Sequence, residues 1–392
     1  MGGSLTSIYN NVSFALNLHT AAMTKLQEQT ATGSRINRIS DDPSSAYQVL
    51  GLNSQTRYLQ NYLDNIAQTS DTLGVVSNVL GNMTSSITKV QTELTQISSG
   101  TYSQDSRERL AEGINDVLEQ MVSLANTRSM NQYVFSGGKT TEPYAVTRSN
   151  DEITSVSYQG ASQSQSIEVS QSVQATLLYA GEDLFSSSSR SAPVFYGDTG
   201  AASGSGTSNV KGDVWLTVTG SPGSYKLSID GGTTEWDVTG DISNVAVSNA
   251  DGEVLYVDAT NITSTGTNLV RVPGTYDIFS SLISIRDILK NTQNLSDEQL
   301  KEFRGVITQS LDEINSQLTN KQTLVGSKIG FLEDLKESLE NVKLNTEDQA
   351  TAIEQADVAQ IAIELSMREI LYQMSLSVTG KLMSVSLLDF IE

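Results

Sequence analysis

The placement of proline is the feature that most restricts how this chain can fold. Its prolines stand at positions 43, 143, 193, 222 and 273, so that residues 44–142 and 274–392 contain none. Proline lacks a backbone donor and clashes with the preceding helical turn, so a long stretch without it is free to form continuous helix. Both stretches also carry apolar residues at alternating steps of three and four, which places them on one helix face. The sequence therefore predicts two long helical arms.

The N-terminal arm contains one apolar series from Leu59 to Ile97. The spacing places Ser70 within this series and has one irregular step, between Leu73 and Val76. Such a series is typical of a coiled-coil seam that is interrupted once by a stammer. A shorter series at residues 110–124 follows Gly100, and we expect it to form the second helix of an antiparallel hairpin.

The C-terminal arm repeats the pattern. A short helix is expected over residues 278–289, and Ser296 has the position of an N-cap for the helix that follows. The apolar positions of this arm are Ile278, Leu282, Ile285, Leu289, Leu311, Ile314, Leu318, Val325, Leu332, Leu335, Leu339 and Val342.

The two ends of the chain are amphipathic and oppositely charged. Residues 1–40 carry Lys25, Arg35 and Arg38 against the single acid Glu28, whereas residues 346–392 carry eight acids against two basic residues. Opposite charge favours side-by-side packing, although an exposed pair contributes only ~0.2–1 kcal/mol. We expect the two terminal helices to meet.

Residues 140–276 differ from both arms. They hold fifteen of the 29 glycines and short alternating runs at 214–218, 225–229 and 254–257, separated by turns at Asp230-Gly231-Gly232 and Asp251-Gly252. This pattern is typical of a β-rich insertion. The predicted fold class is α+β, a long antiparallel helical bundle or coiled coil that brackets a β domain. The predicted divisions are 1–43 (assembly helix and bend), 44–139 (helical rod), 140–276 (β insertion), 277–345 (helical rod) and 346–392 (C-terminal assembly helix).

The composition excludes several classes of function. The 45 acidic residues outnumber the 24 basic ones, giving a net charge of -21, and a surface so acidic repels nucleic acid and anionic lipid. Cysteine is absent, which removes disulfides, thiolate nucleophiles and zinc–thiolate sites. The sequence shows neither an apolar run long enough to span a bilayer nor the pattern of a Sec signal peptide.

Candidate catalytic groups are few. The only histidine, His19, falls on an apolar helical face, where packing is the favoured interpretation over a ligand or general base. Asp41 and Asp42 precede Pro43 and are interpreted as a turn and helix start rather than a cation site.

A second candidate group lies in the insertion, where Asp213, Glu235 and Asp237 flank Trp215 and Trp236. Paired carboxylates beside aromatic rings hydrolyse or bind sugars in some proteins. The interpretation favoured here is that the acids lie on an acidic surface and the tryptophans fill a small core. We therefore predict no catalytic, cofactor-binding or metal-binding residue, and no enzyme.

Three segments resemble a known family. The stretch Gly33-Ser34-Arg35-Ile36-Asn37-Arg38-Ile39-Ser40-Asp41-Asp42-Pro43 is similar to the signature that follows the first helix of the flagellin family. Residues 131–144 and the ending from Ala356 to Ile391 resemble its hook-associated type 3 branch. The resemblance covers roughly residues 1–145 and 275–392, and the β insertion matches no known pattern.

The resemblance implies a structural subunit of the bacterial flagellum at the junction between hook and filament. It implies an extracellular location, export by the flagellar type III system and an export chaperone. The implied partners are copies of itself, the neighbouring hook-associated protein and flagellin. The expected assembly interface comprises Leu5, Ile8, Val12, Leu26, Arg35, Arg38, Asp41, Asp42, Ile363, Ile370, Leu382 and Leu388.

Several alternatives stay open at this point. One alternative is a flagellin that forms the filament itself. Another is an enzyme carried on flagellin-like arms, against which the missing catalytic groups argue. A third is an adhesin whose insertion binds glycans. A further alternative is an unrelated cytoplasmic coiled-coil protein, which explains the apolar series but not the motifs at the two ends.

Overall fold

A computed structural model describes the backbone of residues 2–99 and 103–391, and the side chains of residues 7, 9–96 and 103–381. The chain divides into two compact units. The first comprises residues 1–64 and 335–392, and the second comprises residues 65–334. Two long helices, α2 (Pro43–Ser99) and α6 (Asp297–Glu354), contribute to both units.

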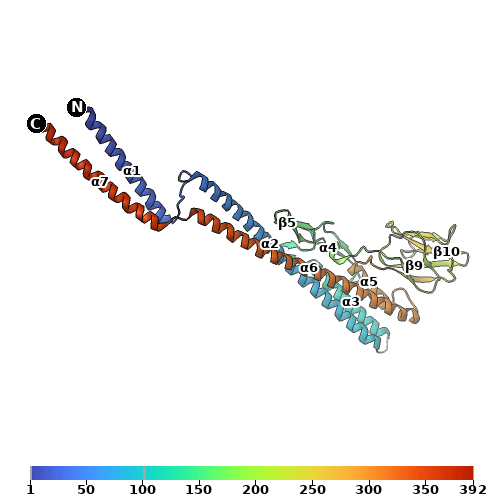
Figure 1. Ribbon diagram of the computed structural model, residues 1–392. Coiled ribbons are helices and arrows are strands. Elements are labelled where there is room, and N and C mark those ends of the chain that lie inside the picture. Colours follow the sequence, from blue (N-terminus) through green and yellow to red (C-terminus); the bar gives the residue numbers. More distant parts are fainter. Residues whose placement is uncertain (1, 100–102, 392) are drawn as a thin grey trace. The chain divides into compact units, whose positions relative to one another are not determined.

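The first unit brings the two ends of the chain together. Helix α1 (Gly2–Thr32) packs against helix α7 (Val358–Ile391), and Figure 1 shows the two helices running side by side. The expectation that the terminal helices meet is confirmed. Further along this unit, the Nζ atom of Lys343 on α6 donates to Gln60 Oε1 on α2 at 2.7 Å, so these two helices are neighbours as well.

The second unit contains the main helical core. Helix α3 (Gln104–Ala125) lies beside α2, where the Ser86 hydroxyl donates to Gln120 Oε1 at 3.0 Å, and it also packs against α5 (Ile278–Lys290). Helices α2 and α6 are antiparallel: Gln91 Nε2 donates to Asp312 at 2.8 Å, and a Cβ at Gly81 would lie 3.1 Å from Gln322 Nε2. The absence of a side chain at Gly81 therefore leaves room for the Gln322 amide.

The predicted apolar series line this core. At most 1% of the surface of Leu73, Leu80, Ile87, Ile114 and Met121 is exposed. The same holds on α6 for a set of residues that the spacing had placed on the buried face, namely Leu311, Ile314, Leu318, Val325 and Leu332. The predicted fold class, paired helical arms around a β-rich insertion, is confirmed.

Several positions of the predicted series are less buried than expected, among them Leu124 and Leu335, which are half-buried. Ser70 is only half-buried, and Thr69 beside it is completely buried instead. The Thr69 hydroxyl donates to the Asn65 carbonyl at 2.7 Å, and a threonine satisfied within its own helix is able to occupy an apolar face. On α6, Val342 was expected to be buried and is 40% exposed.

The start of α6 confirms the predicted N-cap. The Gln299 amide donates to the Ser296 hydroxyl at 3.3 Å, and the Ser296 amide donates to Gln299 Oε1 at 3.0 Å. This reciprocal capping box satisfies two donors that a helix start would otherwise leave unpaired.

The β region begins with three hairpins. They are β1 (Arg128–Ser129) with β2 (Gln132–Tyr133), β3 (Tyr144–Ser149) with β4 (Glu152–Tyr158), and β5 (Gln165–Ser170) with β6 (Val173–Leu178). Tyr144 on β3 contacts the rings of Phe185, on the short helix α4 (Gly181–Phe185), and of Phe279 on α5. These rings join the hairpins to the helical core.

Two further sheets follow. One has the strand order β11-β10-β9-β14-β7, and the other has the order β12-β13-β8. They share a core that includes Leu216, Leu227, Val247, Leu255 and Val270. The three predicted strand runs coincide with β9, β10 and β13. The bounds of these strands are β7 (Val194–Tyr196), β8 (Ala202–Ser203), β9 (Gly212–Ser221), β10 (Ser224–Ser228), β11 (Trp236–Asp237), β12 (Val245–Ser248), β13 (Val254–Asp258) and β14 (Gly266–Val272).

Candidate assembly interface

Helices α1 and α7 are each separated from the next helix by a connector, and the two connectors pair with each other. The Arg35 amide donates to the Glu354 carbonyl at 2.7 Å, and the Ala356 amide donates to the Gly33 carbonyl at 3.0 Å. Gly33 ends α1 with a φ of 69°, a left-handed conformation that glycine adopts without strain. We call residues 33–42 and 355–357 together the joint. It ties the end of α1 to the start of α7.

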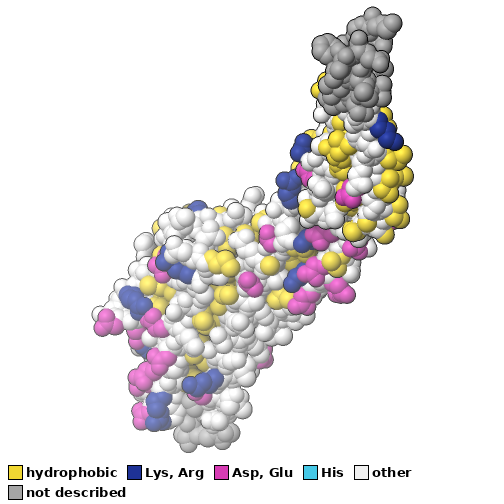
Figure 2. Space-filling model, turned by 90° about the vertical axis from the view of Figure 1, so that its left-hand side faces the viewer, with side chains coloured by type: hydrophobic (Ala, Val, Ile, Leu, Met, Phe, Trp, Pro, Cys, Tyr) yellow, Lys and Arg dark blue, Asp and Glu magenta, His cyan; other side chains and the backbone are white. Residues whose placement is uncertain are grey.

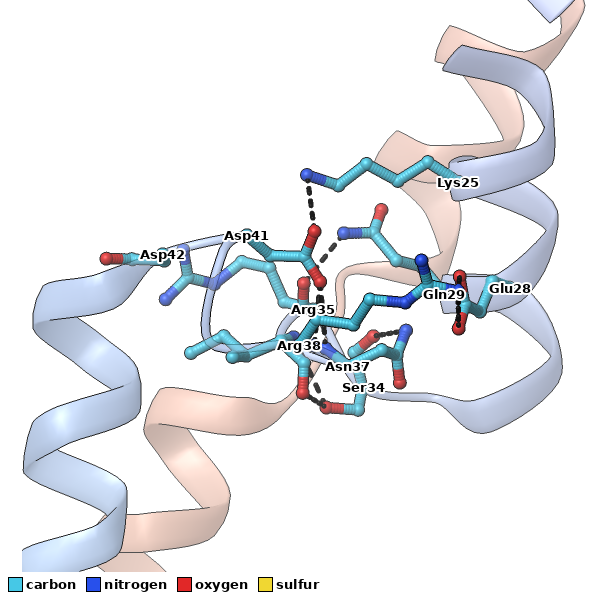
Figure 3. A network of polar contacts seen from close by, with 10 residues as sticks. Lys25, Glu28, Gln29, Ser34, Arg35, Asn37, Arg38, Asp41 and Asp42 are labelled. Atoms are coloured by element: carbon cyan, nitrogen blue, oxygen red, sulfur yellow. Dashed lines mark hydrogen bonds and ion pairs between the residues drawn. The ribbon is translucent and has the colours of Figure 1, made fainter. Parts of the chain in front are cut away.

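Asp41 organises the N-terminal part of the joint (Figure 3). Its Oδ2 atom accepts from the amides of Asn37 at 3.2 Å and Arg38 at 2.9 Å, and its Oδ1 atom lies 3.1 Å from Lys25 Nζ. The hydrogen bond from Lys25, followed by the one from the Arg38 amide, lowers the pKa of Asp41 below its usual value. Asp41 therefore stays ionised and holds the connector against α1.

Asp42 starts helix α2. Its Oδ1 atom accepts from the Ser45 amide at 3.1 Å, as expected of an N-cap residue, and Pro43 takes the first helical position. The Oδ2 atom lies 3.0 Å from Arg35 Nη1. Hydrogen bonds from Ser45, and after them the Arg35 guanidinium, lower the pKa of Asp42 to about 2. The interpretation of Asp41 and Asp42 as a turn and helix start is thus confirmed.

The two arginines of the predicted interface have partners inside the chain. Arg35 also donates to the Ile353 carbonyl at 3.3 Å, and Arg38 Nη2 lies 3.5 Å from Glu28. The ion-pair partners of Lys25, Arg35 and Arg38 therefore all lie within residues 28–42 of the same segment. The charge attraction expected between the two chain ends acts mainly inside the N-terminal segment. A role of the arginines against a neighbouring copy stays a prediction.

No pattern in the sequence singles out Gln29, which is buried beneath the joint and donates to the Arg35 carbonyl at 2.7 Å. The N-cap Asp357 was also missed. Its Oδ1 atom accepts from the amides of Ala359 and Gln360, both at 3.0 Å. An aspartate before an apolar helical run is a readable signal for this cap.

The apolar contact between α1 and α7 is concentrated next to the joint. Leu26, Ala356 and Ile361 are buried together, with Leu365 packed against them. Val12 is half-buried. The side chains of the predicted interface residues Leu5, Ile8, Leu382 and Leu388 lie outside the described residues, although their backbones belong to α1 and α7.

Much of the remaining apolar surface of this helix pair faces solvent, as Figure 2 shows on the upper part of the molecule. Ile363 is 68% exposed and Ile370 is 59% exposed, and both line a shallow hollow on α7 with Met367 and Leu371. The other large apolar side chains of α1 and α7 that are exposed are Tyr9, Phe14, Leu18, Val358, Met374, Leu376 and Val378. Contiguous apolar surface of this kind marks a site of protein–protein contact.

Two of the acids considered in the insertion, Asp213 and Asp237, lie far apart on the sheet. Asp213 stands opposite Arg271 at one end of β9, whereas Asp237 pairs through Lys226 with Thr219 near the other end. Six residues of extended strand separate the two places by ~20 Å, and a glycosidase pair needs ~5–9.5 Å.

The surroundings of these acids and tryptophans only partly match the expectation. Asp213 was expected on the surface and is instead buried beside Arg271 at 3.4 Å, while Glu235 pairs with Lys226 at 2.9 Å on the surface. Trp215 packs against Phe303, but Trp236 is 40% exposed and does not fill a core.

His19 is half-buried on α1, and its Nδ1 atom has no hydrogen-bond partner among the described residues. Among the residues that the structure describes, no group of three or more acidic or histidine side chains is able to hold a metal ion. None of the helices within the described residues is long and apolar enough to cross a membrane.

Comparison with known proteins identifies both ends of the chain. Residues 4–140 match the bacterial flagellin N-terminal helical region, and residues 308–391 match the bacterial flagellin C-terminal helical region. Flagellar hook-associated protein 3 of Escherichia coli is 33% identical over 167 residues, which are 42% of this chain and 50% of that protein. The protein of the same name from Salmonella typhimurium is 34% identical over 119 residues, 30% of this chain and 37% of its own length. The matched residues thus span about half of the length of the first relative and less of the second.

Two solved structures share the fold. Flagellar hook-associated protein 3 of Legionella pneumophila has a TM-score of 0.53 at 16% identity, covering 77% of this chain and 98% of its own. FlgL of Xanthomonas campestris has a TM-score of 0.51 at 17% identity, covering 76% of this chain and 99% of its own. Together with the terminal matches, this likeness accounts for the paired helical arms and the inserted β region.

Proposed function

We propose that this chain, which belongs to the flagellin superfamily, is a structural subunit of the bacterial flagellum that forms the junction between hook and filament. The observation that carries the proposal is the sequence similarity to flagellar hook-associated protein 3 of Escherichia coli at 33% identity. It favours the junction role over the filament role, because the helical regions alone are common to both kinds of subunit.

The geometry of the first unit supports an assembly role. Among the described residues, the helix pair buries its apolar side chains near the joint and exposes others, such as Ile363 and Ile370, further along. Burial of such surface contributes ~25 cal/mol per Å² and drives association. The proposed occupants are copies of the same chain, the neighbouring hook-associated protein and flagellin.

Export through the flagellar type III system and the help of a chaperone are part of the same proposal. A chain without cysteine needs no oxidising compartment for folding, in keeping with folding after export. The extracellular flagellum is the proposed location.

Antibody labelling of intact flagella tests the proposal. An antibody raised against residues 140–276 is applied to flagella and located by electron microscopy. A single short band where hook meets filament is expected. Labelling along the whole filament would make the chain a flagellin, and an unlabelled flagellum would remove the structural role. A strain that lacks the gene serves as the labelling control.

The assembly residues at the extreme ends are tested separately. We expect Leu382→Ala and Leu388→Ala to reduce incorporation into flagella more than they reduce folding of the monomer. Incorporation is measured by immunoblotting of purified flagella, and folding by circular dichroism of the purified chain. Normal incorporation of both variants would argue strongly against an interface at this end.

A further inference from the structure

The second unit contains a large cleft that the assembly role does not use. Its volume is about 1190 Å³, and its walls come from the polar face of α6 at residues 309–321, from α4 and the serine segment 186–189, and from the starts of β9 and α5. Pockets for small organic molecules have volumes of ~300–1,000 Å³. The cleft is therefore much larger than a single metal ion requires, and it has room for an organic ligand.

The charge of the cleft is strongly one-sided. Seven carboxyl groups line it, against only the two ammonium groups of Lys211 and Lys321. Arg271 lies 3.4 Å from Asp213 and 2.7 Å from Glu313, and its single positive charge offsets one of these two carboxylates. The other five have two lysines between them. A concave surface lined by one sign of charge concentrates its field and attracts the opposite charge.

A buried side-chain oxygen on the wall of the cleft accepts no hydrogen bond from the described residues. Gln317 is 7% exposed, and its Nε2 atom donates to the carbonyls of Leu184 at 3.1 Å and Ser186 at 3.0 Å. These two bonds fix the orientation of the amide, because only the nitrogen can donate. The Oε1 atom is left without a hydrogen-bond partner among the described residues. An unpaired buried acceptor costs ~1–3 kcal/mol, so a donor supplied from the cleft would be stabilising.

The buried acid on the wall already has neighbours. Asp213 Oδ1 faces Arg271, and the Ser284 hydroxyl lies beside the same carboxylate. Gln317 Oε1 therefore carries the need for an added donor, since it accepts hydrogen bonds and donates none. Together with the excess of carboxylates, this favours a ligand that is positively charged and rich in hydrogen-bond donors.

We propose that this cleft binds an organic cation through N–H groups, an ammonium or guanidinium carried by a free polyamine or by a lysine or arginine side chain of another protein chain. Such a ligand offers donors to Gln317 and to the serine hydroxyls of the wall, and its charge offsets the excess of carboxylates. The site lies within residues 144–321 and is separate from the terminal helices that carry the assembly proposal.

Calorimetry on the full-length chain tests the proposal. Spermidine and a blocked di-lysine peptide are titrated into the protein at constant ionic strength, with MgCl₂ as the comparison. We expect saturable 1:1 binding of spermidine, of the peptide, or of both, and no comparable binding of Mg²⁺. Binding of spermidine identifies a free amine as a sufficient ligand, and binding of the peptide alone identifies a basic side chain as the source.

Three charge variants separate this site from general attraction to an acidic protein. Glu182→Gln removes a carboxylate of the cleft and is expected to weaken binding about threefold, whereas Lys321→Gln removes a competing cation and strengthens it by a similar factor. Glu298→Gln makes the same charge change on an exposed residue outside the cleft lining and leaves binding unchanged.

Each of the remaining outcomes overturns the proposal. They are equal weakening by Glu182→Gln and Glu298→Gln, binding of Mg²⁺ as tight as that of spermidine, and no saturable binding of either amine. Because the side chains of these three residues make no hydrogen bond or ion pair within the described part of the chain, circular dichroism spectra that match the unmodified chain are expected and are recorded for each variant.

Discussion

The amide of Arg35 donates a 2.7 Å hydrogen bond to the carbonyl of Glu354, residues that lie near opposite ends of the chain. This bond places the break between α1 and α2 beside the break between α6 and α7. Around it, Asp41 and Asp42 hold the connector through side-chain contacts to Lys25 and Arg35. The joint is therefore an ordered element with its own hydrogen bonds, and changes in it are expected to affect the terminal helices.

The first prediction concerns Asp41. Asp41→Ala removes the acceptor of the Asn37 and Arg38 amides and the partner of Lys25. We expect amide hydrogen exchange over residues 33–42 to become roughly fivefold faster, the size of effect that follows from losing one net hydrogen bond. Mass spectrometry of exchanged peptides measures it. Lys25→Ala, which removes only the exposed ion pair, is the control, and an equal effect of both variants would contradict the role of the backbone bonds.

The second prediction separates folding from assembly on one helix turn. Ile361 is 7% exposed and packs with Leu26, whereas Ile363 is 68% exposed. Ile361→Ala is expected to destabilise the contact between α1 and α7 by ~2 kcal/mol or more. Ile363→Ala is expected to leave stability within ~0.5 kcal/mol and to reduce incorporation into flagella. Denaturant unfolding and immunoblots of purified flagella measure the two quantities, and unchanged incorporation of Ile363→Ala would remove this residue from the interface.

The third prediction concerns the buried cation of the β region. Arg271 contacts Asp213, Glu313 and Ser310 and is almost completely buried. Arg271→Met leaves two carboxylates without their cation, and we expect a loss of ~3–5 kcal/mol. The matched control is Lys226→Met, which breaks the exposed pair with Glu235 and should cost less than ~1 kcal/mol. Similar unfolding midpoints for the two variants would show that the buried network contributes little.

The fourth prediction is a pH dependence. Burial raises the pKa of Asp277 to about 6, against hydrogen bonds from Ser280 that lower it. A carboxyl with a raised pKa binds its proton more tightly in the folded state, so its ionisation destabilises the fold progressively from about pH 4 to pH 6.

Asp277→Asn keeps the N-cap of α5 and removes that charge. We expect the variant to exceed the unmodified chain in stability by about 2 kcal/mol at pH 8, less than the full shift implies because Asp277 is partly open to solvent. Near pH 4 the two proteins should match. Denaturant unfolding at both pH values measures this, and a difference that does not change with pH would contradict the assignment.

The fifth prediction tests the capping box of α6. Ser296→Ala removes the acceptor of the Gln299 amide and should lower the free energy of unfolding by ~1 kcal/mol. Thr308→Ala further along the same helix removes an exposed hydroxyl that bonds to its own helix, and its effect should stay within ~0.5 kcal/mol. If both changes shift the denaturation midpoint equally, the capping box contributes no more to stability than an ordinary exposed hydroxyl.

Local patterns in the sequence were sufficient for the long helices, several strands and two of the helix caps. The steps of three and four between apolar residues located α2, α3 and α6. Ser296 and Asp42 indicated helix starts, because an N-cap bonds to a residue only two or three positions further along the chain. The family resemblance rested on the same kind of information, since the segment 33–43 is continuous in the chain. The boundaries proposed for the five divisions of the chain stay predictions.

What only the tertiary structure decided is which side chains meet across long distances in the chain. Asp213 looks like a surface acid until Arg271 and Glu313 are brought beside it, and Arg35 looks free to face another subunit until Asp42 and Ile353 take up its donors. Periodicity assigns a residue to a helix face, and the burial of that face depends on what packs against it. Ile361 and Ile363 are both apolar residues of α7, and only the contact with Leu26 makes one of them core and leaves the other as candidate interface.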